Sequence, residues 1–390
     1  MDNSSTVPDA RHLGREVAPS TEGSADRRSA RPDLRAETLE TSGVAQASSL
    51  APRDQLGRSI LAVALIYTIC IATVFPGSYW TSLSAYTVRR FLIAIPLLLL
   101  VGLISAAIVR SPRAPMMFLR RKLRTRLPGA AIIVIAFVFT AAAFTALKHE
   151  ISLAVPFFAD EILADLDQGL HGGDPWQLLR AFDSPTFDRI YYSLYSQLWF
   201  VWTIGLFLVV AFLDQAKLRN RYLASFLGIA VLLGGVVRTI GNSAGPIFYD
   251  RIFDSDRFAG LDAALASNSG GRLTLQITDY LWQAYATDTT LLGSGISAMP
   301  SLHVAFTCLN ALFLASCRWW LGVIGWTYLA IIGFGSVYFG WHYAADAYVA
   351  IAGTLIIWSV AGRLARVQMM PPKLGETLVL ATDRKTSITT

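Results

Sequence analysis

The chain has 390 residues, of which 54% are hydrophobic and only 15% are charged, and its mean hydropathy is +0.47. Soluble domains carry about 25% charged residues, so this composition argues against a soluble protein and predicts one that is built into a bilayer. The net charge of +6 would suggest nucleic acid for a soluble chain. Here the basic residues lie mostly in short stretches between apolar runs, as in the cytoplasmic loops of membrane proteins, and we expect no nucleic-acid partner.

The two ends of the chain differ from its apolar middle. Residues 1–57 are rich in Ser, Arg, Ala, Asp and Glu, have no apolar core, and are predicted to be a disordered tail without a cleavable signal peptide. Residues 363–390 are predicted to be a second solvated tail, on the cytoplasmic side. The three cysteines contain no CxxC pair and indicate neither a disulfide framework nor a zinc site.

Eight apolar segments lie between these tails. Because lipid offers no water to unpaired backbone groups, each segment is expected to be a helix. The fold class is therefore predicted to be all-α, a polytopic membrane helical bundle with about eight transmembrane helices. The segments run over about 59–75, 91–109, 129–147, 191–213, 222–240, 298–315, 320–339 and 343–361.

The connecting loops predict the orientation of the bundle. Eight spans place three basic stretches on one side, which the positive-inside rule makes cytoplasmic: residues 110–126, 217–221 and 363–366. The two long loops, about 148–190 and 241–297, then lie on the opposite side. The first of them mixes apolar and acidic residues at helical spacing, which predicts an amphipathic helix at the membrane interface. In a bacterium the membrane would be the plasma (inner) membrane.

Three short polar stretches are predicted at this non-cytoplasmic face. They are residues 238–246, where the fifth segment ends, 298–303, where the sixth begins, and 340–346, between the seventh and eighth. Span counting alone therefore brings His303 and His342 to one depth. Ionisable residues near membrane depth are functional candidates by default.

The residue types in these stretches suit phosphoryl transfer. His342 and Asp346 are four residues apart and share a face of a helix, so the carboxylate can fix one imidazole nitrogen and leave the other as a nucleophile. His303 can protonate a leaving alkoxide and then activate an acceptor, and Arg238 can bind phosphoryl oxygens. Each feature also has a structural reading: a plain hydrogen bond, an interfacial histidine, a snorkelling arginine, or a shared metal site.

The three stretches resemble the signature motifs of the type-2 phosphatidic acid phosphatase superfamily. The family's first motif is Lys, six residues, Arg-Pro, and the chain has Arg238, six residues, Gly245-Pro246. The second motif is Pro-Ser-Gly-His, and the chain has Pro300-Ser301-Leu302-His303. The third is Ser-Arg, five residues, His, three residues, Asp, and the chain has Gly335-Ser336, five residues, His342, three residues, Asp346. Two of the family's arginines are therefore absent, and its first lysine is an arginine.

The resemblance implies a role for each matching residue. His342 would attack phosphorus to form a phosphohistidine, Asp346 would orient it, and His303 would act as general acid and then as base. Ser301 and Arg238 would hold phosphoryl oxygens, and Arg251 is a candidate substitute for a missing arginine. No metal ion and no other cofactor is implied. The resemblance covers about residues 129–362, a six-helix catalytic membrane domain preceded at 58–128 by two extra transmembrane helices and a basic cytoplasmic loop.

Met299 before the second motif and Gly245-Pro246 in the first more closely resemble the inositol phosphorylceramide synthase branch, whose members transfer a phosphoinositol head group onto a ceramide, a sphingolipid. These motif residues favour a membrane lipid phosphotransferase. The alternative is a lipid phosphate phosphatase of the phosphatidic acid or isoprenyl diphosphate type, because the two differ only in the acceptor. A non-enzymatic membrane transporter or scaffold is the alternative from another class, although the chain has no clear internal repeat. The residues do not define the donor head group, the acceptor or the oligomeric state.

Overall fold

The computed structural model describes residues 54–87 and 92–367. Every regular element in these ranges is a helix, which confirms the all-α class. The predicted tail 1–57 lies outside the described residues except for its last four. There α2 (Gln55–Val74) already begins, because the side chain of Asp54 caps it by accepting the N–H of Gly57 at 2.9 Å. The second predicted tail lies outside the described residues beyond Val367, where α17 (Ala344–Val367) ends.

Seven helices of the described part are long and apolar enough to cross a membrane. Five of them are single helices: α2, α4 (Leu92–Arg110), α5 (Pro115–Ala154), α16 (Trp319–Tyr338) and α17. The other two are the continuous helical runs Pro185–Ala211, which contains α8 (Pro185–Tyr192) and α9 (Trp199–Ala211), and Ala216–Ile240, which contains α10 (Ala216–Gly228) and α11 (Arg238–Ile240). The chain is thus a multi-pass membrane protein. In addition, α3 (Pro76–Tyr86) follows α2 directly.

The sixth predicted segment is a shorter helix than expected. It forms α15 (Leu302–Cys317), which has 16 residues. At a rise of 1.5 Å per residue it is about 24 Å long, less than the hydrocarbon core of about 30 Å. The helix begins late because the residues before it, including Pro300, are not helical and Ser301 is extended.

The basic stretch between the second and third segments is helical rather than a loop from Pro115 onward. It forms the first turns of α5, whose 40 residues join it to the third segment without a break. Pro115 stands in the first turn, where its missing N–H costs nothing, and arginine and lysine are good helix formers. One helix therefore connects the basic end of the bundle to the opposite end.

At the core of the bundle, α15 packs against α9, α10, α16 and α17. Small residues let α15 and α16 approach closely, as is common between membrane helices. A Cβ atom added at Gly325 would lie 2.7 Å from the Cα atom of Ala311. The helices α2, α3 and α4 pack on α5 and so lie beside the core.

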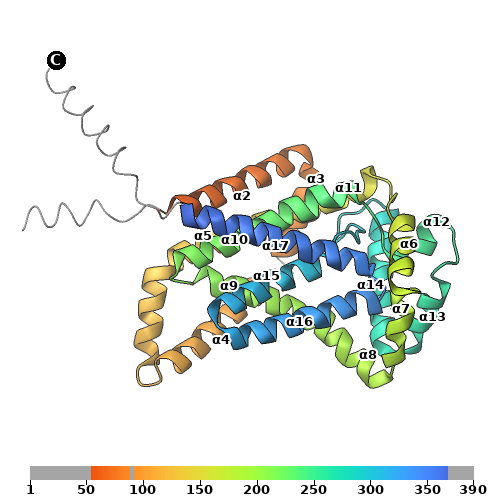
Figure 1. Ribbon diagram of the computed structural model, residues 1–390. Coiled ribbons are helices and arrows are strands. Elements are labelled where there is room, and N and C mark those ends of the chain that lie inside the picture. The colour runs from red at the N-terminus through yellow and green to blue at the C-terminus, as the bar shows by residue number, and fades with distance from the viewer. Residues whose placement is uncertain (1–53, 88–91, 368–390) are drawn as a thin grey trace, which may run out of the picture. The chain divides into compact units, whose positions relative to one another are not determined.

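The two long loops contain short helices that gather at one end of the bundle (Figure 1). The first holds α6 (Asp160–His171) and α7 (Pro175–Leu179); the second holds α12 (Pro246–Phe253), α13 (Ala259–Ser267) and α14 (Ser269–Ala286). Helix α6 is amphipathic in an unusual sense. It exposes Ile162, Leu166 and Leu170, and it buries Asp160 and Asp167.

Candidate active site

His342 and Asp346 are in contact at the start of α17. His342 lies in the turn between α16 and α17, and its Nδ1 atom is 3.3 Å from Oδ2 of Asp346. The same carboxylate oxygen accepts the backbone N–H of Tyr343 at 3.0 Å. Asp346 is fully buried, and its other oxygen has no hydrogen-bond partner. The spacing of four residues thus produces the predicted carboxylate–imidazole pair.

His303 lies in the first turn of α15, and aromatic rings hold it. Its imidazole stacks on Tyr195, with ring centroids 5.2 Å apart, and lies against Trp199 at 4.0 Å. The indole N–H of Trp199 donates to the carbonyl of His303 at 3.1 Å. The N–H of Ser301, two residues before His303, donates to the carbonyl of Asp346 at 3.4 Å, so the second motif contacts the start of α17. His303 on α15 and His342 in the turn before α17 therefore lie at the same end of the bundle, as span counting predicts.

Ser301 and Arg238 lie in the same buried region and have unused polar atoms. The Nη2 group of Arg238 donates to Oγ of Ser152 at 3.1 Å and to the carbonyl of Ile296 at 2.9 Å. Its Nε atom has no partner, and neither does Oγ of the fully buried Ser301. Buried polar atoms without partners are costly. Together with the free oxygen of Asp346, they leave donors and an acceptor available to a ligand.

The structure does not join Arg251 to this group. Arg251 lies on α12, and its guanidinium forms an ion pair with Asp279 at 2.8 Å. The Asp279 carboxylate therefore neutralises the guanidinium charge that would otherwise attract a phosphate. The assignment of Arg251 to the phosphate pocket stays a prediction, and no contact of the described residues supports it.

A comparison with protein-family models matches residues 161–360, 200 of the 390 residues, to the PAP2 superfamily. The chain belongs to the PAP2 superfamily. This is the type-2 phosphatidic acid phosphatase superfamily that the motifs resemble, so the chain is an enzyme of the phosphatase and phosphotransferase type, and the transporter or scaffold alternative is set aside. The search of the curated proteins and the search of the solved structures gave no match. The match lies within the predicted domain 129–362, whose boundaries stay a prediction.

In this PAP2 enzyme, the backbone itself excludes one of the absent family arginines. Gly245 occupies that position with φ of +93°, and a Cβ atom there would lie 2.6 Å from the carbonyl oxygen of Trp341. Next to it, the N–H of Ile247 donates to the carbonyl of Gly340 at 2.9 Å. The first-motif loop thus packs directly on the third-motif loop, and it can do so only without a side chain. At the other absent arginine, Ser336 is fully buried and donates to the carbonyl of Gly333.

Lys148 lies beside this group of residues, although no motif includes it. It stands near the end of α5, outside the family match, and is partly buried. Its Nζ atom donates to the carbonyl of Gly293 at 3.3 Å, in the same segment as the carbonyl of Ile296 that accepts Nη2 of Arg238. One signal in the sequence could have found it: a lysine at the non-cytoplasmic end of a predicted span goes against the positive-inside rule.

Sequence reasoning also missed the pair formed by Asp160 and Asp167. Asp160 accepts the N–H groups of Ala244 and Gly245 at 2.8 and 2.9 Å and the hydroxyl of Tyr343 at 2.9 Å. Burial outweighs these three donors and raises the pKa of the Asp160 carboxyl to about 6. Asp167 accepts the N–H groups at the start of α17, and burial raises the pKa of its carboxyl as well. Their spacing of seven residues on an amphipathic helix was the available signal.

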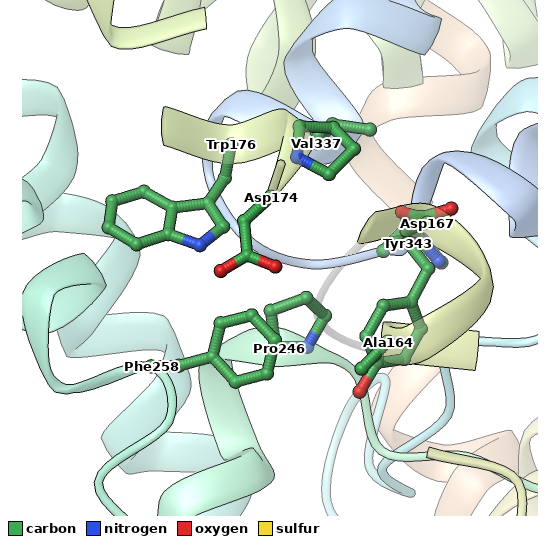
Figure 2. Close-up of a pocket in the computed structure, with 10 residues that line it drawn as sticks. Ala164, Asp167, Asp174, Trp176, Pro246, Phe258, Val337 and Tyr343 are labelled. Carbon is green, nitrogen blue, oxygen red and sulfur yellow. The ribbon is translucent and has the colours of Figure 1, made fainter. Parts of the chain in front are cut away.

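The nucleophile candidate is neutral at physiological pH. Burial lowers the pKa of His342 to about 3; a hydrogen bond with the backbone of Ala298 opposes the shift, and the positive charge of Lys148 adds to it. A neutral imidazole has a lone pair available for attack. A pocket reaches His342 from the side of α6 and α7. Figure 2 shows Asp174, Trp176, Phe258 and Tyr343 around it.

Within the described ranges, no three His, Cys, Asp or Glu side chains gather as the ligands of a metal ion would. The two histidines and Asp346 are therefore not arranged as the metal site that their residue types allow. The same residues are arranged as a carboxylate–imidazole pair facing a second imidazole.

Proposed function

We propose that the protein is a membrane lipid phosphotransferase, which moves a phosphorylated head group from a lipid donor to a lipid hydroxyl through a phosphohistidine. The observation that supports this most is the contact between the two histidine motifs: Asp346 holds His342, and the carbonyl of Asp346 accepts the N–H of Ser301, two residues before His303. A nucleophile held by a carboxylate and facing a second acid–base group is the arrangement that covalent catalysis requires.

In the first step, the free nitrogen of His342 attacks phosphorus and forms the N–P bond while the P–O bond to the leaving group breaks. His303 donates a proton to the leaving oxygen. Asp346 stabilises the positive charge that the attacking ring acquires. Arg238 and Ser301 donate hydrogen bonds to the phosphoryl oxygens, whose charge is greatest in the transition state.

In the second step, His303 takes the proton of an acceptor hydroxyl, whose oxygen attacks phosphorus while the N–P bond breaks. A lipid hydroxyl as acceptor gives transfer, and water gives a phosphatase. The residues of the second motif and the absence of two family arginines favour transfer, as in the inositol phosphorylceramide synthase branch. A lipid phosphate phosphatase on the same residues is the second candidate.

We place the site at the non-cytoplasmic face. The basic stretch at the start of α5 supports this, since Lys122 and Arg126 bind Asp214 beyond the end of α9. Lys148 stands 26 residues later on the same helix, about 39 Å further along its axis. The basic end and the site thus lie at opposite ends of the bundle, as the positive-inside rule requires. The exposed apolar side chains of α6 fit a helix lying at the membrane interface.

The proposal is tested on purified protein in detergent with labelled phosphatidic acid, an isoprenyl diphosphate and phosphatidylinositol, each with and without ceramide or diacylglycerol. A new lipid that requires the acceptor and disappears in His342→Ala supports transfer. Phosphate release that disappears in the same variant supports the phosphatase. His171→Ala is the matched control, because His171 bonds Tyr348 and the carbonyl of Asp167 and touches neither histidine. Equal turnover by the wild type and His342→Ala on every donor would overturn both candidates.

A further inference from the structure

The motif residues leave the phosphate pocket short of positive charge. The family's motifs contain a lysine and two arginines, whereas this chain has Arg238, Gly245 and Ser336 at those positions. Gly245 cannot be an arginine because of its backbone, and Ser336 is buried within α16. A phosphoryl group bound at His342 would therefore meet a single motif cation.

We propose, building on the function proposed above, that Lys148 of α5 is the second cation of this pocket and binds the anionic oxygens of the phosphoryl group. Its place on the helix supports this. The carbonyl of Lys148 accepts the hydroxyl of Ser152 at 2.7 Å, and the same hydroxyl accepts Nη2 of Arg238 at 3.1 Å. One serine thus joins the backbone of Lys148 to the guanidinium of Arg238.

Neither cation has an anionic partner among the described residues. The ion pairs of this part of the chain join other arginine, lysine or histidine side chains to a carboxylate. Lys148 instead donates to a carbonyl, and Arg238 donates to a hydroxyl and a carbonyl. Arg238 is buried and Lys148 is partly buried, and removing a cation from water without a counter-charge is expensive. Two such cations beside each other define a region that an anion would stabilise.

The position of Lys148 relative to both histidines makes that anion the reacting group. Nζ of Lys148 donates to the carbonyl of Gly293, and Nη2 of Arg238 donates to the carbonyl of Ile296, in the segment that leads to Ser301 and His303. The N–H of Ser301 in turn donates to the carbonyl of Asp346 at 3.4 Å. A phosphoryl group between the two imidazoles therefore lies within reach of the lysine and of Arg238. The oxygens would be held from two helices, α5 and α11, that are far apart in the sequence.

The segment before α15 fixes the lysine from the other side. Gly295 has φ of +95°, and a Cβ atom there would lie 2.7 Å from the carbonyl oxygen of Lys148. Nζ of Lys148 also donates to the carbonyl of Gly293 in the same segment. If Lys148 were purely structural, this hydrogen bond would be its only contribution. A variant that removes the charge but keeps a donor distinguishes that role from phosphate binding.

Lys148→Gln tests the charge, because glutamine keeps an N–H donor near the carbonyl of Gly293 but has no charge. Lys148→Arg keeps the charge. Lys217→Met is the matched control, because Lys217 is exposed in the first turn of α10, near the basic end of the bundle. The variants are compared in kcat/KM with the donor that the wild type uses, and in the rise of the melting temperature on adding orthovanadate, a phosphate analogue.

We expect Lys148→Gln to lower kcat/KM roughly 100-fold, as for the loss of one preorganised donor to a transition state, and to abolish the stabilisation by orthovanadate. Lys148→Arg should retain most of both, and Lys217→Met should match the wild type. Orthovanadate stabilisation of Lys148→Gln equal to that of the wild type would overturn the proposal. Since this binding requires no turnover, it also separates failure at Lys148 from failure of the proposed reaction, which His342→Ala tests.

Discussion

Asp160 and Asp167 lie two turns apart on one face of α6, and together they hold the first-motif loop and the third-motif loop. Asp160 accepts the N–H groups of Ala244 and Gly245, and Asp167 accepts those of Ala344 and Ala345, two and three residues after His342. Helices have unsatisfied N–H groups at their first turn, and at α17 a side chain from another helix accepts them. Helix α6 therefore fixes the distance between the two loops.

Replacing Asp167 with alanine should loosen the start of α17. Two buried N–H groups would lose their acceptor, at a cost of roughly 1–3 kcal/mol each, and His342 would lose its fixed position. We expect a lower melting temperature in detergent and a fall in kcat that exceeds any change in KM. Asp165→Ala is the control on the same helix, because Asp165 is exposed and its ion pair with Arg257 is worth at most about 1 kcal/mol. Equal effects of the two variants would contradict a positioning role for Asp167.

The raised pKa of Asp160 predicts how stability depends on pH. The carboxyl binds its proton more tightly in the folded protein, with a pKa of about 6 against 3.8. Its contribution to the free energy of unfolding is therefore full below about pH 3.8 and is lost as the pH rises through about 6, with a total of at most about 3 kcal/mol. Melting temperatures of the wild type and Asp160→Asn should converge or cross between pH 4 and pH 7. A difference that stays constant over this range would show that Asp160 does not titrate there.

The lowered pKa of His342 predicts the opposite dependence of stability on pH. Its pKa is about 3 in the folded protein against 6.5 for an exposed imidazole. Its contribution to stability is therefore full above about pH 6.5 and falls as the pH is lowered, by at most about 1.4 kcal/mol per pH unit. The wild type should lose stability between pH 6.5 and pH 5 more steeply than His342→Asn. Parallel curves for the two proteins would mean that the buried imidazole takes up its proton as readily as an exposed one.

Gly245→Ala should disturb the site without removing a functional group. The residue has a positive φ, and the added methyl group would meet the carbonyl oxygen of Trp341 next to His342. Alanine at a positive φ costs more than the roughly 0.4–1 kcal/mol that it gains elsewhere, and the contact adds to this. We expect a lower melting temperature and lower kcat. Gly205→Ala in α9 meets nothing within 4 Å and should be neutral or slightly stabilising; a Gly245→Ala protein that behaves the same way would disprove the close approach.

Local patterns of the sequence were sufficient to predict the helices and the central pair of the site. Hydropathy locates a span because lipid demands a continuous apolar helix. A spacing of four keeps His342 and Asp346 close enough to pair, although His342 lies in the turn before α17 and not on a helix face shared with Asp346. The depth of His303 also followed, since each pair of spans returns the chain to the same face. The shortness of α15 was not visible in the hydropathy, because Ala298 and Met299 continue the apolar run although they precede the helix.

Contacts between different elements were decided by the tertiary structure alone. Lys148 stands 194 residues before His342, and only the packing of α5 beside α11 and the 293–296 segment brings its charge to the imidazoles. Asp160 and Asp167 of α6 belonged to an acidic stretch in the sequence, yet they face inward because buried loop N–H groups need acceptors. Arg251 was a candidate phosphate ligand, and only the tertiary structure shows its ion pair with Asp279 of α14. Hydropathy and spacing act within one element, whereas the partner of a buried charge depends on which elements meet, and no local pattern of residues encodes that.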